Sequence, residues 1–392
     1  MGTWEIKKLS QIAEINPKES IKKGTIAKKV GMDKLIPFCR DILTYEIAEY
    51  SGGVKFRNGD TIMARITPCL ENGKTAKVDI LDKGEIGFGS TEYIVFRAKE
   101  GNDEDYLYYL ICSSLVREQA IKSMVGSSGR QRVQTDVVGN LEIVVPPLHV
   151  QEKIGACLKV IDDRIGINNK INNNLEQQAE AYFQELFIDN VNPTWTVGTI
   201  SDLGTVVGGS TPSKSKPEYY AKTGIAWITP KDLSINKSKF ISHGKNDISE
   251  LGLKNSSASV MPEGTVLFSS RAPIGYIAIA AGEVTTNQGF KSVVPKHEIG
   301  TPFVYCFLRH NLPIIEGMAS GSTFKEVSSN TMRNIPVAIP DARTLAKFND
   351  FCAPLFVQQQ ILEKENQSLT TLRDSLLPKL LSGELDVSEL HS

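Results

Sequence analysis

Two stretches of the chain carry apolar residues at the spacing of a coiled-coil seam. From Ile154 to Leu186 the apolar or amide positions step alternately by four and three residues, and the same steps recur from Phe348 to Leu380. This heptad pattern predicts two long helical arms. We expect Pro354 to break or kink the second arm and Pro378 to disturb its end, because proline lacks an N–H and clashes with the preceding turn.

Both arms are apolar at their ends and polar in the middle, where Asn172 and Asn366 hold equivalent positions. A polar residue in such a seam commonly fixes the register. We therefore expect the arms to pack antiparallel, with these two residues near the crossing. The alternative is that each arm lies on its own globular domain and its asparagines face water. The residues expected to pair the arms are Ile161, Ile165, Asn172, Leu175, Leu355, Leu362, Asn366 and Leu369.

Outside the arms the apolar runs are short, rich in β-branched residues and separated by Gly, Pro, Asn and Asp, which predicts curled sheets with loops. Two pairs of equivalent strands are expected, 61–65 with 266–271 and 92–97 with 290–295. A helix is expected after each second strand, over 105–122 and over 302–317, the latter interrupted at Pro313.

The second half of the chain is a diverged copy of the first. Val133, Asn140 and Pro146 match Val327, Asn334 and Pro340 at an offset of 194 (327 − 133), which continues through the arms. Trp4 and Trp195 match at an offset of 191 (195 − 4). The change of offset from 191 to 194 indicates small insertions in the segment between the tryptophans and the constant part of the repeat. Chance similarity of two helices is the alternative, but the matched Trp and Pro residues lie outside the helices.

The repeat predicts an α+β protein with two similar globular domains of curled sheet and helices, joined by the two arms about a pseudo-two-fold axis. The expected segments are a first variable domain (1–147), a first arm (148–190), a second variable domain (191–340), and a second arm with a C-terminal tail (341–392). Each unit is large enough to be a domain with a helical arm.

Composition narrows the class of protein. The 392 residues are 41% hydrophobic and 23% charged, as in a globular protein, and no apolar run is long enough for a signal peptide or a membrane span. The six cysteines form no CxxC and have no histidine at zinc spacing, which suggests thiols of a reducing cytoplasm without disulfide or metal. A net charge of −1 argues against nonspecific coating of nucleic acid, although local basic patches remain compatible with it.

The usual catalytic motifs are missing from the sequence. In the segment 68–75 a proline replaces the first glycine of a phosphate-binding loop, and neither a glycine-rich cofactor loop nor an Asn-Pro-Pro-aromatic tetrapeptide of a methyltransferase is present. Pro340-Asp341 has no following Glu-x-Lys strand of a metal nuclease, and the five histidines are scattered. We expect no catalytic residue, metal or cofactor in this chain.

Several landmarks together resemble the specificity subunit of type I restriction–modification systems over essentially the full length. They are the Trp-x-x-x-x-hydrophobic openings (4–9 and 195–200), the Gly/Ser-rich turns before Asn-x-x-x-x-x-Pro (126–146 and 320–340), the arms, and the terminal segment 376–385. The resemblance implies a non-catalytic protein in which each variable domain is a target-recognition domain that reads one half of a bipartite, asymmetric double-stranded DNA site.

The same resemblance implies that the arms fix the gap and dock two modification (methyltransferase) subunits, with restriction subunits joining through the complex in defence against phage. A helix of about 30 residues spans about 45 Å, which is comparable with one turn of duplex DNA, about 34 Å. Three functions are distinguished: a DNA-specificity subunit, an enzyme that acts on nucleic acid alone, and a coiled-coil scaffold that reads no DNA.

Because the base-reading loops of this family vary, we expect DNA contacts from polar loop residues beside the repeat landmarks. Arg can bind guanine, Asn or Gln can pair with adenine, and Lys more often contacts phosphate. In the first domain the candidates are Arg65, Thr67, Asn72, Lys74, Ser90, Arg130, Gln131 and Arg132. In the second they are Ser210, Thr211, Lys214, Lys216, Lys231, Arg271, Tyr276, Asn287, Gln288 and Lys325. For each of them a solvated surface position is the alternative.

Overall fold

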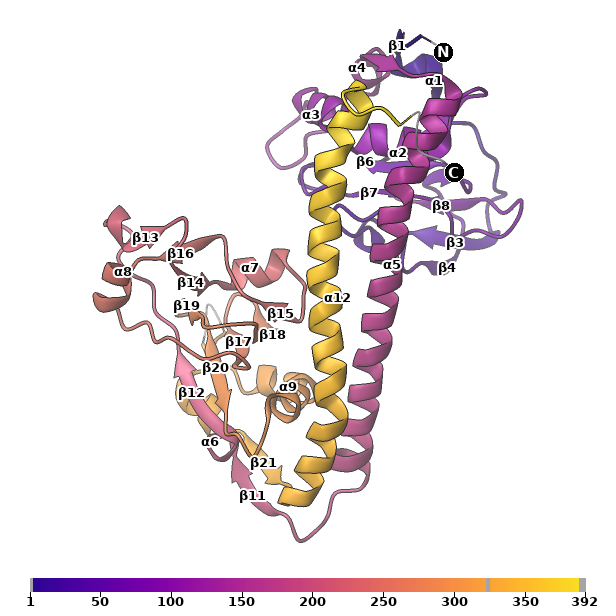
Figure 1. Ribbon diagram of the computed structural model, residues 1–392. Helices are drawn as coiled ribbons and strands as arrows, with labels where there is room; N and C mark the ends of the chain where they lie inside the picture. The colour runs from indigo at the N-terminus through magenta and orange to yellow at the C-terminus, as the bar shows by residue number, and fades with distance from the viewer. Residues whose placement is uncertain (1–2, 322–324, 388–392) are drawn as a thin grey trace. The chain divides into compact units, whose positions relative to one another are not determined.

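The computed structural model describes residues 3–321 and 325–387, which divide into two compact units (Figure 1). Unit 1 comprises residues 1–167 with 366–392, and unit 2 comprises residues 168–365. Each unit therefore contains one globular part and one part of each of two long helices. The segment 322–324, which belongs to the second Gly/Ser-rich turn, lies outside the described residues.

The two predicted arms are the helices α5 (Leu148–Gln184) and α12 (Ala342–Ser382). Their first residues are 194 positions apart (342 − 148), so the repeat also holds for the helix starts. Within unit 2 the ring of Tyr182 lies 4.6 Å from that of Phe351, and the Gln359 amide donates to the Asn172 carbonyl at 3.1 Å. Numbers that rise along α5 thus fall along α12, so the helices run antiparallel there.

The predicted seam positions are buried or half-buried along both helices. Leu158 and Leu362 are buried, and Ile165, Leu175, Leu355 and Leu369 are half-buried. Asn172 belongs to unit 2 and Asn366 to unit 1, so their expected approach stays a prediction.

The expected break of the second arm at Pro354 is wrong, because α12 is continuous through Pro354 and through Pro378. A proline inside a helix costs about 3 kcal/mol. On both sides of Pro354 the helix buries Phe348, Cys352 and Phe356 in the core of unit 2, and burying large apolar side chains offsets a cost of that size.

The globular part of unit 1 contains two four-stranded sheets, in the orders β2-β9-β6-β7 and β4-β3-β8-β5, and a two-stranded ladder, β1-β10. Neighbouring strands are antiparallel except β3 and β8. The strands are β1 (Glu5–Lys8), β2 (Ala13–Ile15), β3 (Ile26–Val30), β4 (Glu46–Glu49), β5 (Val54–Phe56), β6 (Thr61–Ala64), β7 (Thr75–Lys77), β8 (Gly87–Gly89), β9 (Tyr93–Ala98) and β10 (Glu142–Val145). The helices are α1 (Leu9–Ile12), α2 (Glu104–Cys112), α3 (Ser114–Lys122) and α4 (Thr135–Gly139).

The globular part of unit 2 repeats this plan with a five-stranded sheet, β12-β20-β17-β18-β15, a four-stranded sheet, β13-β16-β14-β19, and the ladder β11-β21. The strands are β11 (Thr196–Thr199), β12 (Gly204–Gly208), β13 (Tyr220–Ala221), β14 (Ile225–Ile228), β15 (Phe240–Ile241), β16 (Asn246–Ile248), β17 (Val266–Ser270), β18 (Ile274–Ala280), β19 (Thr285–Thr286), β20 (Lys291–Pro295) and β21 (Pro336–Ile339). The helices are α6 (Ile200–Leu203), α7 (Pro230–Ile235), α8 (Glu250–Lys254), α9 (Thr301–His310), α10 (Leu312–Gly317) and α11 (Ser329–Arg333).

The expected α+β architecture with an internal repeat is confirmed. The strand pairs β6/β17 and β9/β20 fall where the sequence predicted them. The expected helix over 105–122 is two helices that meet at Ser113, whose hydroxyl donates to the Leu110 carbonyl at 2.6 Å. Its counterpart divides at Asn311, and Pro313 lies in the first turn of α10, where a missing N–H costs nothing.

Candidate nucleic-acid interface

Unit 2 carries a polar hollow of about 610 Å³ beside its four-stranded sheet. Six of the predicted DNA-binding residues line it: Thr211, Lys214, Lys231, Arg271, Asn287 and Gln288. The other lining residues are Tyr220, Trp227, Thr229, Pro230, Asn246, Ala272 and Gly289. Cations, amides and two aromatic rings thus converge on one concave surface, which is the combination that reads base edges and neutralises phosphates.

The hollow is assembled by close approach of two loops. The Ser210 N–H donates to the Thr286 carbonyl at 2.9 Å, and the Trp227 indole N–H donates to the Ser210 carbonyl at 3.0 Å. A Cβ on Gly209 would lie 1.9 Å from the Asn287 carbonyl oxygen, so only glycine permits this approach. The contact brings Thr211 to Gln288, whose side chains are hydrogen bonded.

The remaining predicted residues of unit 2 do not line the hollow. The Lys216 ammonium contacts the Tyr219 hydroxyl at 3.2 Å. The Lys237 ammonium lies 4.2 Å from the centre of the Tyr276 ring. Ser210 contributes its backbone to the loop contact, and Lys325 adjoins the segment that is not described. Sequence reasoning missed Tyr220 and Trp227, because aromatic residues in short apolar strands look like core residues.

In unit 1 three predicted residues contact Glu92, and two further predicted residues beside them contact each other. The Arg65 N–H donates to the Glu92 carbonyl at 2.9 Å, the Thr67 N–H donates to the Gln131 carbonyl at 3.0 Å, and the Glu92 N–H donates to the Ser90 hydroxyl at 3.1 Å. The fifth residue is Arg132, whose guanidinium binds the Glu92 carboxylate through Nε at 3.0 Å and Nη2 at 2.6 Å.

The other three predicted residues of unit 1 are set apart from this group. The Lys74 ammonium donates to the Met32 carbonyl at 2.7 Å, so its charge is directed into the domain. Asn72 and Arg130 are exposed, the latter at the tip of the Gly/Ser-rich turn. Glu92 itself was missed, because its pairing with a residue 40 positions away leaves no local signal.

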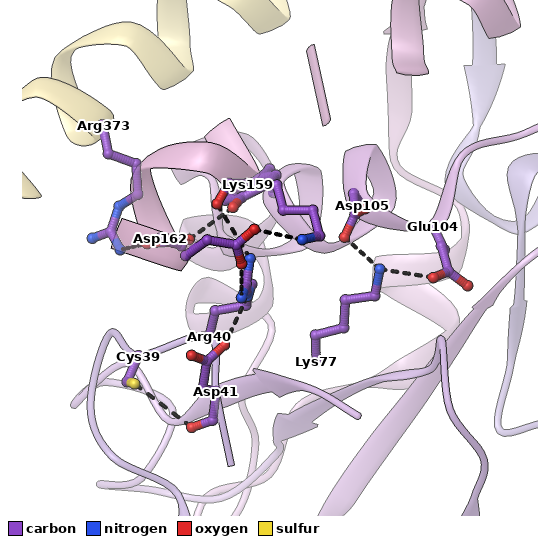
Figure 2. A network of polar contacts seen from close by, with 11 residues as sticks. Cys39, Arg40, Asp41, Lys77, Glu104, Asp105, Lys159, Asp162 and Arg373 are labelled. Atoms are coloured by element: carbon purple, nitrogen blue, oxygen red, sulfur yellow. Dashed lines mark hydrogen bonds and ion pairs between the residues drawn. The ribbon is translucent and has the colours of Figure 1, made fainter. Parts of the chain in front are cut away.

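A buried polar network fastens the globular part of unit 1 to both long helices (Figure 2). The Arg373 guanidinium lies 2.7 Å from Asp162, which also accepts from the Tyr109 hydroxyl at 2.8 Å. The Arg40 guanidinium binds Asp163 at 2.5 Å. Although burial opposes it, hydrogen bonds from Lys159 and Arg40 hold the pKa of Asp163 below its usual value.

Unit 2 uses different residues for the same attachment. The Lys239 ammonium contacts Glu176 at 2.7 Å and Gln359 at 2.9 Å, and it lies 3.2 Å from the centre of the Phe356 ring. Burial lowers the pKa of Lys239. The pKa of Glu176 is also lowered: burial would raise it, but Lys239 and a hydrogen bond from Gln359 outweigh that effect. The globular part of each unit is therefore held on its segments of α5 and α12 by ionic contacts.

No cluster of three or more His, Cys, Asp or Glu side chains that could hold a metal occurs in residues 3–321 and 325–387. Within the same ranges no helix is long and apolar enough to cross a membrane.

Comparison with known proteins places these features in a family. The family model described as the type I restriction modification DNA specificity domain matches residues 1–177 and again 192–370. The MjaIX specificity subunit of Methanocaldococcus jannaschii is 37% identical over 194 residues, which are 47% of this chain and 45% of that protein. The match thus spans less than half of that relative.

A longer match reaches the HindI specificity subunit of Haemophilus influenzae, which is 24% identical over 407 residues, 84% of this chain and 87% of that protein. The crystal structure of a type I restriction–modification system S subunit from M. genitalium is similar in fold, with a TM-score of 0.59, 16% identity and 96% of each chain covered.

Proposed function

The chain belongs to the type I restriction modification DNA specificity domain family, and on that premise we propose that it is the non-catalytic subunit that selects the DNA sequence in such a system. The resemblance inferred from the sequence is thereby confirmed. The family model matches twice, once in each half of the repeat, which supports a reader with two recognition domains.

One observation carries the proposal: the helices and strands of the two units repeat, while the candidate DNA-reading residues differ. This repeated arrangement of helices and strands is called the frame below. The helices α4 and α11 begin 194 residues apart (329 − 135), as do α5 and α12. In contrast, the hollow of unit 2 is lined by Arg271, Asn287 and Gln288, whereas Arg65, Arg132 and Gln131 cluster in unit 1. Two domains with the same fold but different DNA-facing side chains are expected to recognise two different half-sites, as in a bipartite, asymmetric DNA site.

Within this proposal, Arg271, Asn287 and Gln288 contact base edges, because their side chains offer the donors and acceptors that distinguish purines. Lys214 and Lys231, at the edge of the same hollow, contact phosphates. In the first domain Arg65, Gln131 and Arg130 are the corresponding candidates. The recognition domains are taken as 1–147 and 191–340, as the sequence predicts.

The long helices supply the spacing and the surface for partners. With 37 and 41 residues, α5 and α12 are each longer than one turn of DNA, given a rise of about 1.5 Å per residue. We assign to them the fixed gap between the half-sites and the docking of two modification subunits, with restriction subunits joining through that complex. Such a complex would act on DNA in the cytoplasm.

The test is to co-express the chain with its modification subunit and to select bound sequences from a random duplex library at controlled salt. A split motif with two defined halves and a constant gap supports the proposal. A single contiguous motif would mean that only one domain reads DNA. A stable complex without any enriched sequence would favour a scaffold instead, and methyl transfer or cleavage by the isolated chain would identify an enzyme.

A further inference from the structure

The two units carry opposite charges at one equivalent position. Arg132 and Glu326 are 194 residues apart (326 − 132), which is the offset of the repeat. The backbone confirms the equivalence: the N–H of the next residue, Val133, donates to the Arg65 carbonyl at 2.9 Å, and that of Val327 donates to the Ser270 carbonyl at 3.0 Å. A cation at this position in unit 1 is therefore replaced by a carboxylate in unit 2.

In unit 1 the cation at this position is bound by Glu92. The Arg132 guanidinium contacts both carboxylate oxygens, with its shortest distance at 2.6 Å, and 45% of the Arg132 side chain remains exposed. Hydrogen bonds from Arg132 lower the pKa of Glu92 despite partial burial, and the charge of Arg65 acts in the same direction. The Glu92 carboxylate is thus bound by Arg132, while the Arg65 guanidinium donates to the Val133 carbonyl at 3.4 Å.

In unit 2 the carboxylate at this position again faces two cations. Glu326 lies 3.2 Å from the Lys291 ammonium and 3.5 Å from the Arg271 guanidinium. Arg271 also lines the polar hollow, and 36% of its side chain is exposed. Although the signs at the equivalent position are reversed, both units pair one carboxylate with a partly exposed arginine beside a candidate reading surface.

A carboxylate and a DNA phosphate offer similar acceptors to arginine, because both fit the two parallel N–H donors of a guanidinium. The carboxylates of Glu92 and Glu326 therefore accept the hydrogen bonds that the arginines could otherwise donate to phosphate oxygens of DNA. The Arg132–Glu92 and Arg271–Glu326 pairs leave 45% and 36% of the arginine side chain exposed. Ion pairs with this exposure contribute little stability, so a well-placed phosphate can displace the carboxylate from the arginine. Lys291, whose side chain is 11% exposed, stays with Glu326. A phosphate that is poorly placed must compete with it.

We propose that Glu92 and Glu326 are specificity-determining residues that restrain the DNA-facing cations of their own domains. The cations are released to the DNA only when other base contacts of the same domain align the duplex. The carboxylates thereby weaken binding to unrelated DNA more than binding to the correct half-site, since rejecting wrong partners is one of the two routes to specificity. This inference rests on the proposed function.

The test uses the full chain in complex with its modification subunits. Affinity and its salt dependence are measured for the selected duplex and for duplexes scrambled in one half-site, with the half-sites assigned by domain exchange. The variants are Glu92→Gln and Glu326→Gln. Their controls are Glu100→Gln and Glu298→Gln, which make the same charge change at exposed positions just after β9 and β20.

Glu326→Gln is expected to raise the affinity for DNA scrambled in its own half-site roughly fivefold, the upper effect of an exposed ion pair. The slope of log affinity against log salt becomes steeper by about 0.9, which corresponds to one more phosphate contact. The affinity for the selected duplex rises less, so discrimination falls for that half-site only. Glu92→Gln has the same effect on the other half-site.

Three results would overturn the inference. One is weaker binding of all duplexes by both Glu326→Gln and Glu326→Ala, which would mean that the carboxylate positions the cations for DNA. A second is an equal gain in the control variants, which would reduce the effect to net charge. A third is discrimination by the Glu92→Gln and Glu326→Gln complexes that equals the discrimination of the wild-type complex. A wild-type complex that selects no sequence at all would contradict the proposed function itself, and this inference with it. The three results above contradict the inference alone, because they are obtained with a wild-type complex that does select a sequence.

Discussion

The Arg373 guanidinium and the Asp162 carboxylate form a buried ion pair, 2.7 Å apart, between the α5 and α12 segments of unit 1. The repeat places Phe356 (162 + 194) and Ala179 (373 − 194) at the equivalent positions of unit 2, and both belong to its apolar core. At these two positions the repeated helices thus accept a buried ion pair in one copy and apolar side chains in the other, where the Lys239 ammonium lies against the Phe356 ring.

This relationship predicts that the ion pair fixes geometry more than it adds stability. Arg373→Ala leaves Asp162 buried without its cation and is expected to lower the free energy of unfolding by about 3 kcal/mol. The double variant Asp162→Phe/Arg373→Ala copies unit 2 and should cost clearly less. Urea unfolding of the full chain measures both. A double variant at least as unstable as Arg373→Ala would show that the pair itself is required.

The attachment of the second domain should be sensitive to acid through Glu176. Its pKa lies below the ordinary value of 4.5 in the folded protein, because the contacts with Lys239, Gln359 and Arg309 outweigh burial. A carboxylate with a lowered pKa stabilises the fold above its unfolded pKa, and this stability is lost as pH falls through the folded pKa. The urea midpoint of the wild type should therefore fall below about pH 4.5 more steeply than that of Glu176→Gln. Parallel profiles of the two proteins would contradict this role.

Variants of the base-contacting and the phosphate-contacting residues in the hollow of unit 2 should have different effects on DNA binding. Arg271→Ala and Gln288→Ala are each expected to cost about 1–3 kcal/mol of discrimination, in the second half-site alone. Lys214→Ala should weaken binding to all sequences and reduce the salt slope by about 0.9. Lys222→Ala, an exposed change outside the hollow, serves as the control. Equal effects of Arg271→Ala on both half-sites would remove it from the reading set.

The loop contact at Gly209 should be intolerant of any side chain. An alanine Cβ would lie 1.9 Å from the Asn287 carbonyl oxygen and 2.5 Å from that of Thr286, so the loop 286–288 must move. Gly209→Ala is expected to cost about 1–3 kcal/mol of stability and to impair reading of the second half-site. Gly282→Ala has no atom within 4 Å of the new Cβ and should behave as wild type in thermal unfolding and DNA binding.

Local patterns in the sequence predicted much of the frame. The heptad spacing and the 194-residue offset predicted both arms, and the strand pairs β6/β17 and β9/β20 lie in the short β-branched runs where the sequence predicted them. The continuity of α12 through Pro354 could not be predicted, because burial of Phe348 and Phe356 by distant residues outweighs a local rule. The division of the helices at Ser113 and Asn311 likewise depends on tertiary packing.

The candidate site was predicted only where its residues sit on loops beside repeat landmarks. Arg271, Asn287 and Gln288 were chosen for that reason, and the fold brings them to one hollow. Glu92 and Glu326 were not found, because each matters through partners that are 20 or more residues away. Lys74 is the opposite case, a residue that the sequence predicted to bind DNA. In the structure its ammonium donates to the Met32 carbonyl instead.

The central claim, two independent readers on one frame, is tested most directly by duplicating the first reader. Residues 192–341 are replaced by a second copy of residues 1–147, so that each copy ends directly before its long helix and carries its tryptophan as the fourth residue. Sequence selection with the modification complex should then yield a split motif whose two halves are the same half-sequence. Retention of the original second half, or loss of all preference in a stable complex, would contradict the account.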